Sequence, residues 1–323
     1  MSPKSPFDSL ITVYGGSGFL GRHVVRALAK RHYRIRVAVR RPDLAGHLQP
    51  LGRVGQIHAV QANVRDPVSV EGAARDADAL INLVGILAEG GRQRFDAVHM
   101  AGAEAVAKAA AASDARMIHV SAIGADENST AEYARSKGLG EQRVIENVPG
   151  AVVFRPSIMF GPDDTFFNRF AALARLSPVL PLIGGGLSRF SPVFVGDVAA
   201  AIADAVDGRA TPGTIYELGG PDTLTFKELM QFTLKTIERT RILLPIPFAL
   251  ARPLAMIAQF FPGAPLTPDQ VEMLRSDNVV SDAAKREGRT FEAFGIVPDS
   301  IAAIVPAYLW RFRKFGQFSR RHA

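Results

Sequence analysis

Cysteine is absent from all 323 residues of the chain, and this absence removes several kinds of chemistry. A disulfide framework, a thiolate nucleophile and a cysteine-ligated metal are all excluded. The absence is compatible with a reducing compartment without proving one. We identify no other metal-ligand motif, so we expect no metal site.

Long uninterrupted apolar runs are also missing. The most apolar stretch, Ile242 to Pro262, carries the single charge Arg252, but prolines at 245, 247, 253 and 262 interrupt it. A transmembrane helix needs about 20 apolar residues whose backbone groups are satisfied internally. We therefore predict a bent, largely buried or interfacial element. Met1 to Phe7 hold two prolines and no apolar core, which predicts neither a signal peptide nor a transit sequence.

The composition is that of a globular protein, with 47% hydrophobic and 21% charged residues. The net charge of +7 suits phosphorylated ligands, anionic lipid or nucleic acid equally well. Aromatic and basic residues interleave only in the C-terminal tail, so we expect no nucleic-acid partner. The length predicts two lobes.

Short apolar runs alternate with helical patterns up to Arg155. The predicted strands are Leu10–Tyr14, Ile35–Val39, Ile57–Val60, Ala79–Val84, Met117–Val120 and Ala151–Phe154. Near-continuous apolar strands separated by helices indicate a parallel sheet covered on both faces. We predict an α/β fold: a doubly wound Rossmann domain over residues 1–165, with 190–206 returning to it, and a smaller, mostly helical C-terminal lobe over 166–323. Its predicted helices lie near Thr225–Glu238, Thr267–Arg275 and Ile301–Arg313.

A glycine-rich turn follows the first predicted strand directly. Gly15, Gly18 and Gly21 form a G-x-x-G-x-x-G pattern, and the helix that follows begins at Phe19 and Leu20. Glycines let the backbone approach a pyrophosphate, and a helix N-terminus offers it free N–H groups. This position favours dinucleotide binding; the alternative is a tight turn needed only for packing.

Two arginines, Arg40 and Arg41, end the second predicted strand. NAD binders usually place an acidic residue there, which holds the ribose 2′-hydroxyl. A guanidinium can instead bind a 2′-phosphate in bidentate fashion, so we expect NADPH (NADP) to be preferred over NAD. The alternative is an exposed basic turn.

Tyr133 and Lys137 are four residues apart in a helical pattern that runs toward Glu146. The spacing places both on one face, where the lysine can lower the pKa of the phenol and hold the nicotinamide ribose.

These motifs, in this order, resemble the extended and atypical branches of the short-chain dehydrogenase/reductase superfamily. Asn63-Val64-Arg65-Asp66, Asn82-Leu83-Val84-Gly85 and Arg155-Pro156-Ser157 also match. The resemblance implies that Asp66 contacts the adenine, that Val84 and Gly85 line the cofactor cleft, and that Pro156 and Ser157 lie beside the nicotinamide. Asp66 followed by Pro67 is equally typical of a helix N-cap.

Two positions depart from the pattern of active members. Ser121, the candidate catalytic serine, comes immediately at the predicted strand end, and Ile123 stands two residues later. His99 replaces the active-site asparagine, as either a structural or a catalytic histidine.

The sequence of the second lobe indicates a particular branch of this superfamily. Leu266 to Val280, after the proline-interrupted stretch, looks like the nucleotide-binding accessory subunits of respiratory complex I (NADH:ubiquinone oxidoreductase) and their bacterial relatives. That resemblance implies a structurally held NADPH on a protein docked near the membrane, peripheral to the cytoplasmic face of the inner membrane. The alternative is an active NADPH-dependent reductase of a lipid-like carbonyl or quinone precursor.

The C-terminal tail supports peripheral membrane association. Leu309 to Ala323 carry five cations and no acidic residue, interleaved with Trp310, Phe312, Phe315 and Phe318. Such cations favour an anionic surface; the alternative is a helix whose aromatics pack on the second lobe.

Overall fold

The computed structural model describes residues 5–259 and 266–315. Contacts along the backbone group the chain into two compact units. The first comprises Met1–Pro156, Gly196–Leu218 and Ser281–Ile296; the second comprises Ser157–Val195, Gly219–Val280 and Val297–Ala323. Each unit therefore contains segments that are distant in the sequence.

The first unit is built on a seven-stranded parallel sheet with the order β11-β6-β5-β4-β1-β2-β3. Its strands are β1 (Leu10–Tyr14), β2 (Arg34–Val39), β3 (Ile57–Gln61), β4 (Ala79–Asn82), β5 (Arg116–Val120), β6 (Val152–Pro156) and β11 (Ile215–Leu218). The strand order reverses between β1 and β4, and ligands of such sheets bind at that switch point.

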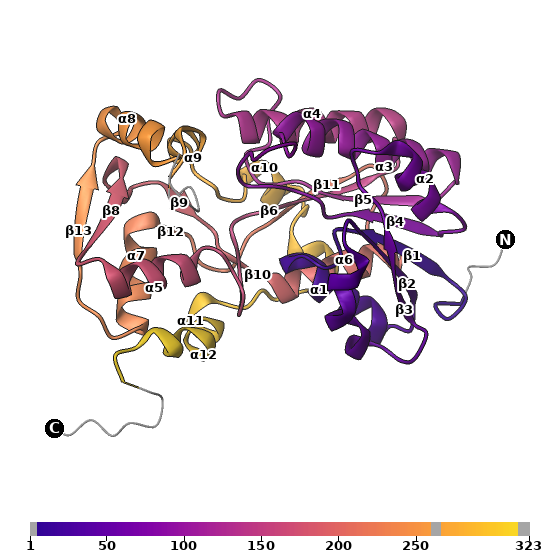
Figure 1. Cartoon of the computed structure of the whole chain (residues 1–323), viewed down its shortest axis with the longest axis horizontal. Coiled ribbons are helices and arrows are strands. Elements are labelled where there is room, and N and C mark those ends of the chain that lie inside the picture. Colours follow the sequence, from indigo (N-terminus) through magenta and orange to yellow (C-terminus); the bar gives the residue numbers. More distant parts are fainter. Residues whose placement is uncertain (1–4, 260–265, 316–323) are drawn as a thin grey trace. The chain divides into compact units, whose positions relative to one another are not determined.

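Helices cover both faces of this sheet (Figure 1). They are α1 (Phe19–Lys30), α2 (Pro67–Ala74), α3 (Ala101–Ala112), α4 (Glu132–Asn147), α6 (Val195–Val206) and α10 (Asp282–Arg286). On one face lie α2, α3 and α4; α1 and α6 share the other, where Arg31 pairs with Asp204 and Asp207 at 2.9 and 2.5 Å. This is the predicted doubly wound Rossmann arrangement, which confirms the fold class.

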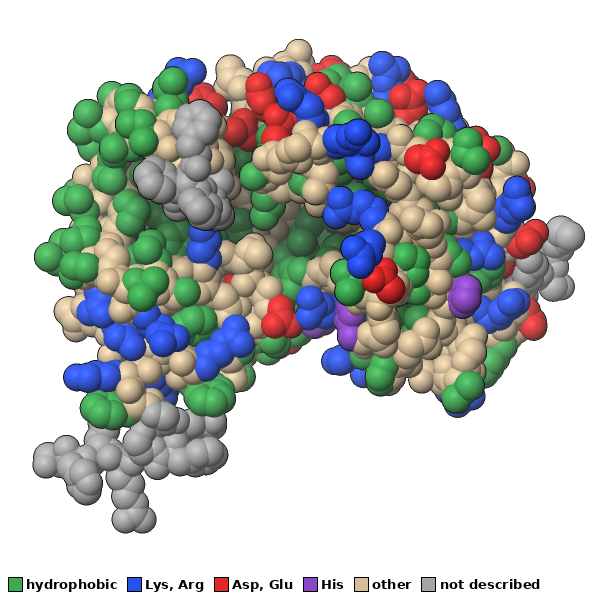
Figure 2. Space-filling view, viewed as in Figure 1, with side chains coloured by type: hydrophobic (Ala, Val, Ile, Leu, Met, Phe, Trp, Pro, Cys, Tyr) green, Lys and Arg blue, Asp and Glu red, His purple; other side chains and the backbone are tan. Residues whose placement is uncertain are grey.

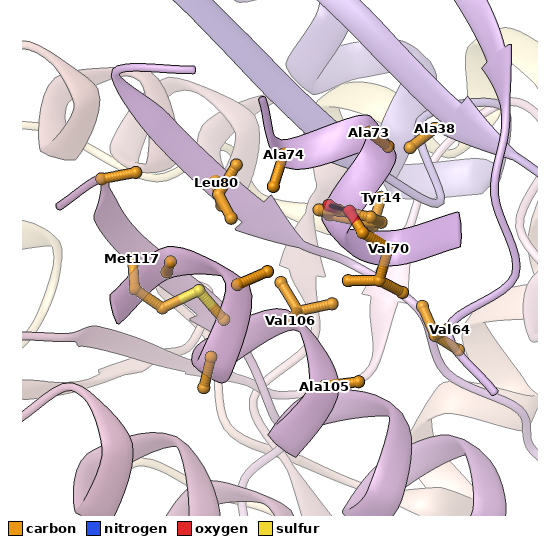
Figure 3. Close-up of a cluster of buried hydrophobic side chains, with 14 of the residues drawn as sticks. Tyr14, Ala38, Val64, Val70, Ala73, Ala74, Leu80, Ala105, Val106 and Met117 are labelled. Carbon is orange, nitrogen blue, oxygen red and sulfur yellow. Dashed lines mark hydrogen bonds between the residues drawn. The ribbon is translucent and has the colours of Figure 1, made fainter. Parts of the chain in front are cut away.

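Small side chains bring α2 and α3 close to the sheet. Figure 3 shows Leu80 and Met117 of the sheet facing Val70 of α2 and Val106 of α3, within a buried cluster rich in alanine. The phenol of Tyr14 donates to the carbonyl of Val70 at 2.7 Å inside this cluster. The end of β1, immediately before the glycine turn, is thereby fixed.

The second unit is mainly helical, with three two-stranded sheets. Its helices are α5 (Phe167–Leu176), α7 (Phe226–Thr236), α8 (Phe248–Ala258), α9 (Pro268–Met273), α11 (Ile301–Ile304) and α12 (Pro306–Leu309). Its strands are β7 (Met159–Phe160), β8 (Val179–Ile183), β9 (Arg189–Phe190), β10 (Val193–Phe194), β12 (Leu224–Thr225) and β13 (Ile242–Ile246). Phenylalanines of α5 and α7 dominate its core.

The described part of the C-terminal tail packs on its own unit. Arg311 donates to Asn168 Oδ1 at 2.6 Å, and Arg313 Nε donates to the Thr236 carbonyl at 3.0 Å. Phe312 packs against the core of the unit. Phe318, Arg320 and Arg321 lie outside the described residues. In residues 5–259 and 266–315, no helix is both long and apolar enough to cross a bilayer.

Candidate nucleotide-binding site

A groove of about 240 Å³ lies in the first unit where β1, β2, β3 and β4 end. Its lining includes five of the residues predicted to bind a cofactor, namely Gly15, Gly18, Arg40, Val84 and Gly85. Ser17, Ala38, Val39, Ala62, Asn63, Val64, Arg65, Leu83, Ile86, Gln93 and Val98 complete it. The groove thus opens at the switch point of the sheet.

The three glycines of the turn are required for different structural reasons. Gly15 has a φ of +80°, a conformation that favours glycine, and its carbonyl accepts from Gly18 N at 3.0 Å. A Cβ on Gly21 would lie 2.3 Å from the Gly15 carbonyl oxygen, so Gly21 permits α1 to pack on the turn. A Cβ on Gly18 would meet only that same oxygen, at 3.2 Å. Gly18 therefore leaves the space beside the N-terminus of α1 open.

The N-terminus of α1 faces this space. Gly18 is its N-cap residue and makes no side-chain cap, and α1 begins at Phe19 and Leu20. The first backbone N–H groups of a helix have no intrahelical acceptor, and the helix dipole makes this end positive. The turn and the helix together fit a pyrophosphate group.

The two arginines after β2 differ in their surroundings. Arg41 forms a bidentate ion pair with the Asp43 carboxylate, with nitrogen–oxygen distances of 2.7 to 3.3 Å, and it does not line the groove. Arg40 does line the groove and is exposed. Within the described chain, Arg40 has no hydrogen bond or ion pair. Its guanidinium is therefore available to an anionic ligand.

Asp66 lies beside the groove lining but is not part of it. It is the N-cap residue of α2, before Pro67 at the first helical position, although its side chain makes no cap hydrogen bond. Asn63, Val64 and Arg65 form the groove wall at this point. The N-cap position is as the sequence indicates, and contact with adenine stays a prediction.

A buried hydrogen-bond chain joins the groove to α4. His99 Nε2 accepts from Ile86 N at 3.0 Å, and His99 Nδ1 lies 2.9 Å from Ser136 Oγ. Ser136 Oγ donates to the Tyr133 carbonyl at 2.8 Å. Because Nε2 accepts, Nδ1 carries the proton and donates to Ser136. The ring is neutral, since burial lowers the pKa of His99 to about 2, with the nearby Lys137 charge adding to the effect.

His99 lies in a π-helical turn, Asp96–Met100, directly before α3. A Cβ on Gly140 would be 2.2 Å from the His99 carbonyl oxygen, so this glycine lets α4 pass close to the turn. The Tyr133 ring meets the edges of Phe95 and His99 at centroid distances of 5.9 and 5.4 Å. The histidine thus joins the segment at Ile86 to the helix that carries Tyr133.

Lys137 is buried beside the end of β5. Its Nζ donates to the Val120 carbonyl at 3.1 Å, and a Cβ on Gly85 would lie 3.3 Å from Nζ. Burial lowers the pKa of Lys137 to about 8, against the opposing effect of Glu141. Ser121, directly after β5, is 4% exposed, and its Oγ has no hydrogen-bond partner among the described residues. A buried hydroxyl without a partner here fits a ligand that supplies one.

The Lys137 pKa has a consequence for stability. The folded chain binds fewer protons than the unfolded chain between pH 8 and about 10.5, so the stability of the nucleotide-free protein rises with pH in that window. We expect the stability of wild type relative to Lys137→Met to increase from pH 8 to about 10, measured by urea unfolding. Lys108→Met, which removes an exposed lysine, is the control. If the difference in unfolding free energy between wild type and Lys137→Met did not change with pH, the lowered pKa of Lys137 would be contradicted.

Pro156 and Ser157 lie at the end of β6 and just after it. The Pro156 carbonyl accepts from Ile123 N at 3.0 Å within the first unit. In the second unit, Ser157 Oγ donates to Asn278 Oδ1 at 2.7 Å, and Asn278 N donates to the Arg189 carbonyl at 2.8 Å. Asn278, part of the distinctive Leu266 to Val280 segment, therefore fixes the start of its unit.

The structure gives two buried residues near the site a role that the sequence does not indicate: Asn82, the first residue of the Asn82–Gly85 motif, and His119. Asn82 Oδ1 accepts from Val84 N at 3.1 Å, and its amide lies 3.2 Å from His119 Nδ1. Burial lowers the pKa of His119 to about 3. A histidine in the middle of an apolar strand gives no signal that its partner is on the neighbouring strand.

A larger open depression, about 530 Å³, lies by α4 around the Glu141–Arg155 ion pair and contains none of the groove residues.

Comparison with known proteins bears on this groove. Residues 11–219 match the NAD dependent epimerase/dehydratase family. The chain belongs to that family. Subunit 9 of the NADH dehydrogenase [ubiquinone] 1 alpha subcomplex, a mitochondrial protein of Arabidopsis thaliana, is 33% identical over 318 residues, covering 94% of this chain and 78% of the relative. A ceramide reductase of Caulobacter vibrioides is 37% identical over 193 residues, covering 60% of this chain and 59% of the relative.

Solved structures agree on the fold. An NADPH-dependent quinone oxidoreductase of Escherichia coli, complexed with NADPH, has a TM-score of 0.72 at 19% identity, covering 93% of this chain and 99% of that one. As a member of the NAD dependent epimerase/dehydratase family, the chain has complex I subunits among its homologues and a ceramide reductase as a partial relative. The predicted resemblance is confirmed.

Proposed function

We propose that the chain holds NADPH in this groove as an accessory subunit of a respiratory complex I, docked peripherally at the cytoplasmic face of the inner membrane, without turning the cofactor over. The observation that carries this proposal is the extent of similarity. The complex I relative matches 94% of the chain, whereas the reductase relative matches 60%. Similarity that continues through the second unit favours a shared partner surface.

The residues of the groove support a tightly held dinucleotide. The N–H groups at Phe19 and Leu20 would bind the pyrophosphate, Arg40 the 2′-phosphate, and Lys137 the nicotinamide ribose. Arg41, which pairs with Asp43 and does not line the groove, would contribute little to this binding. Val84 and Gly85 would line the nicotinamide side, with Pro156 and Ser157 beside it. Nothing in this set requires a substrate.

An active reductase is the second candidate, and the Tyr133–Lys137 pair favours it. When bound, the nicotinamide of NADPH supplies a hydride. Tyr133 would donate its phenolic proton to the oxygen of a lipid-like carbonyl or quinone, and the Lys137 ammonium would stabilise the phenolate left behind. Ser121 Oγ, which has no hydrogen-bond partner in the described chain, would donate to the same oxygen.

Turnover separates the two candidates. We expect wild type to oxidise NADPH no faster than buffer with quinones, prenyl aldehydes, long-chain acyl ketones or sugar-nucleotide ketones, because the cofactor is held and not used. The decay of NADPH absorbance measures this. NADPH oxidation that falls by about a hundredfold or more in Tyr133→Phe, with NADPH binding retained, would replace the accessory role by a reductase.

A further inference from the structure

An apolar surface covers β13 and α8 of the second unit. Figure 2 shows hydrophobic side chains gathered over these two elements, at the left edge of the view. Ile242 and Leu244 are 64% and 49% exposed on β13, and further exposed side chains on α8 are Leu250, Leu254, Met256 and Ile257. We call these six residues the β13–α8 face. Contiguous exposed apolar side chains of this kind mark interaction sites.

The helix α8 is apolar on two sides. Ala251 and Ala255 are fully buried and pack with Val271 of α9. Leu250, Leu254 and Ile257, spaced i, i+4 and i+7, form a second stripe that points away from this packing. A helix that is apolar on both sides normally has a partner on both sides. The inner partner is α9, and the outer stripe has none within the described residues.

The strand β13 continues the same face. It pairs with β8 from Ile242↔Val179 to Ile246↔Ile183. Ile242 and Leu244 lie on the same side of the strand and are exposed, whereas Leu243 between them packs against the core of the unit. The end of α5 adjoins the strand, since Arg241 Nε donates to the Ala174 carbonyl at 2.7 Å.

The segment that carries the face is basic. Residues 239–268 contain three arginines (Arg239, Arg241 and Arg252) and no aspartate or glutamate. Arg252 on α8 and Arg175 near the end of α5 are exposed. Lys and Arg side chains also lie next to the face in Figure 2. The nearest acidic residues in the sequence are Glu238, which lies 3.4 Å from Arg313, and Asp269 and Glu272 of α9, of which Glu272 lies 3.1 Å from Arg275. An apolar face on a basic segment suits the surface of an anionic bilayer.

The composition of the face distinguishes a bilayer from a protein partner. Protein interfaces carry about one hydrogen bond per 100–200 Å² and are enriched in aromatic residues, methionine and arginine, of which the face itself contains one methionine, Met256. The six side chains of the face are aliphatic or thioether groups without a hydrogen-bond donor. A second copy of the chain would bring the same arginines together. Acyl chains need no hydrogen-bond donors from the protein, and anionic headgroups carry the charge opposite to that of the arginines.

We propose that the β13–α8 face binds the surface of an anionic lipid bilayer directly, with its aliphatic side chains in the interfacial layer. This deepens the proposed peripheral location by naming the partner and the surface. It rests on that location but not on NADPH binding. The site lies in residues outside the basic C-terminal tail.

Sedimentation with vesicles tests the proposal on the full chain. We expect wild type to bind vesicles of phosphatidylcholine with about one-third phosphatidylglycerol at least about tenfold more tightly than pure phosphatidylcholine at about 50 mM salt, and binding to weaken at higher salt. Leu250→Glu/Leu254→Glu should lose at least about tenfold in affinity for the anionic vesicles, because it places two charges in the apolar stripe.

The matched control is Val54→Glu/Val297→Glu, which adds the same charge at two exposed valines elsewhere and should bind vesicles like wild type. NADPH binding of each variant shows that it is folded and tests the nucleotide site separately. Wild type that binds no vesicle at low salt would overturn the proposal. So would binding only to an isolated respiratory complex, or a dimer that Leu250→Glu/Leu254→Glu dissociates.

Discussion

Replacing Gly18 by valine is expected to lower the affinity for NADPH by at least about a hundredfold while the chain stays folded. Gly18 has φ −75° and ψ −178°, an extended conformation that valine adopts readily. Its Cβ would meet only the Gly15 carbonyl oxygen, at 3.2 Å, so the branched side chain would enter the groove. It would displace a pyrophosphate that several charge-assisted hydrogen bonds hold, at about 1.5–3 kcal/mol each. Calorimetry with NADPH measures the loss.

Two further variants make this result specific. Gly72→Val places valine in open space on α2, away from the groove, and should bind NADPH like wild type. Gly21→Ala places a Cβ 2.3 Å from the Gly15 oxygen and should destabilise the fold by about 1–3 kcal/mol. Undiminished binding by a folded Gly18→Val protein would show that the dinucleotide binds elsewhere.

The second large effect concerns cofactor choice. Arg40→Asp should weaken NADPH binding by about ten- to a hundredfold, because the lost bidentate phosphate contact contributes about 1.5–3 kcal/mol. NADH should gain relative to NADPH, since the new carboxylate repels a 2′-phosphate and can accept from a 2′-hydroxyl. Parallel titrations of both nucleotides against wild type and variant give the two ratios.

Arg41→Asp is the matched control, because it changes the same charge at the neighbouring position. Arg41 already pairs with Asp43 and does not line the groove, so its loss should alter the NADPH to NADH ratio far less. Equal effects at both positions would mean that only the general positive field matters. Wild type that binds NADH as well as NADPH would remove the 2′-phosphate site altogether.

Local sequence patterns predicted the elements of the first unit closely. The strand at Leu10–Tyr14 has the predicted bounds, and α1 follows the glycine turn as expected. These signals are local: an apolar run, a turn and a helical period. The strand β11 (Ile215–Leu218) was missed because its four residues lie far along the chain and are recognisable only by pairing with β6. A predicted helix over Ile301–Arg313 is broken at Pro306.

In the site, too, some contacts follow from local sequence and others depend on long-range packing. Gly15 and Gly18 directly follow β1, and Arg40 directly follows β2. Because β1 and β2 are neighbouring parallel strands, the strand order alone brings these residues to one groove. The chain from Ile86 through His99 to Ser136 depends on a π-helical turn and a close helix contact, which no local pattern indicates. The proline-interrupted stretch bends as predicted, but its outer side chains are exposed because α8 offers only one face to α9.

The groove is proposed to hold NADPH tightly enough that the nucleotide stays bound through purification. The most direct measurement is to purify the full chain without added nucleotide, denature it, and identify the released nucleotide by chromatography and mass spectrometry. We expect NADPH or NADP at close to one molecule per chain from wild type and almost none from Gly18→Val. Wild type that releases no nucleotide, or releases NAD in place of NADP, would contradict this proposal.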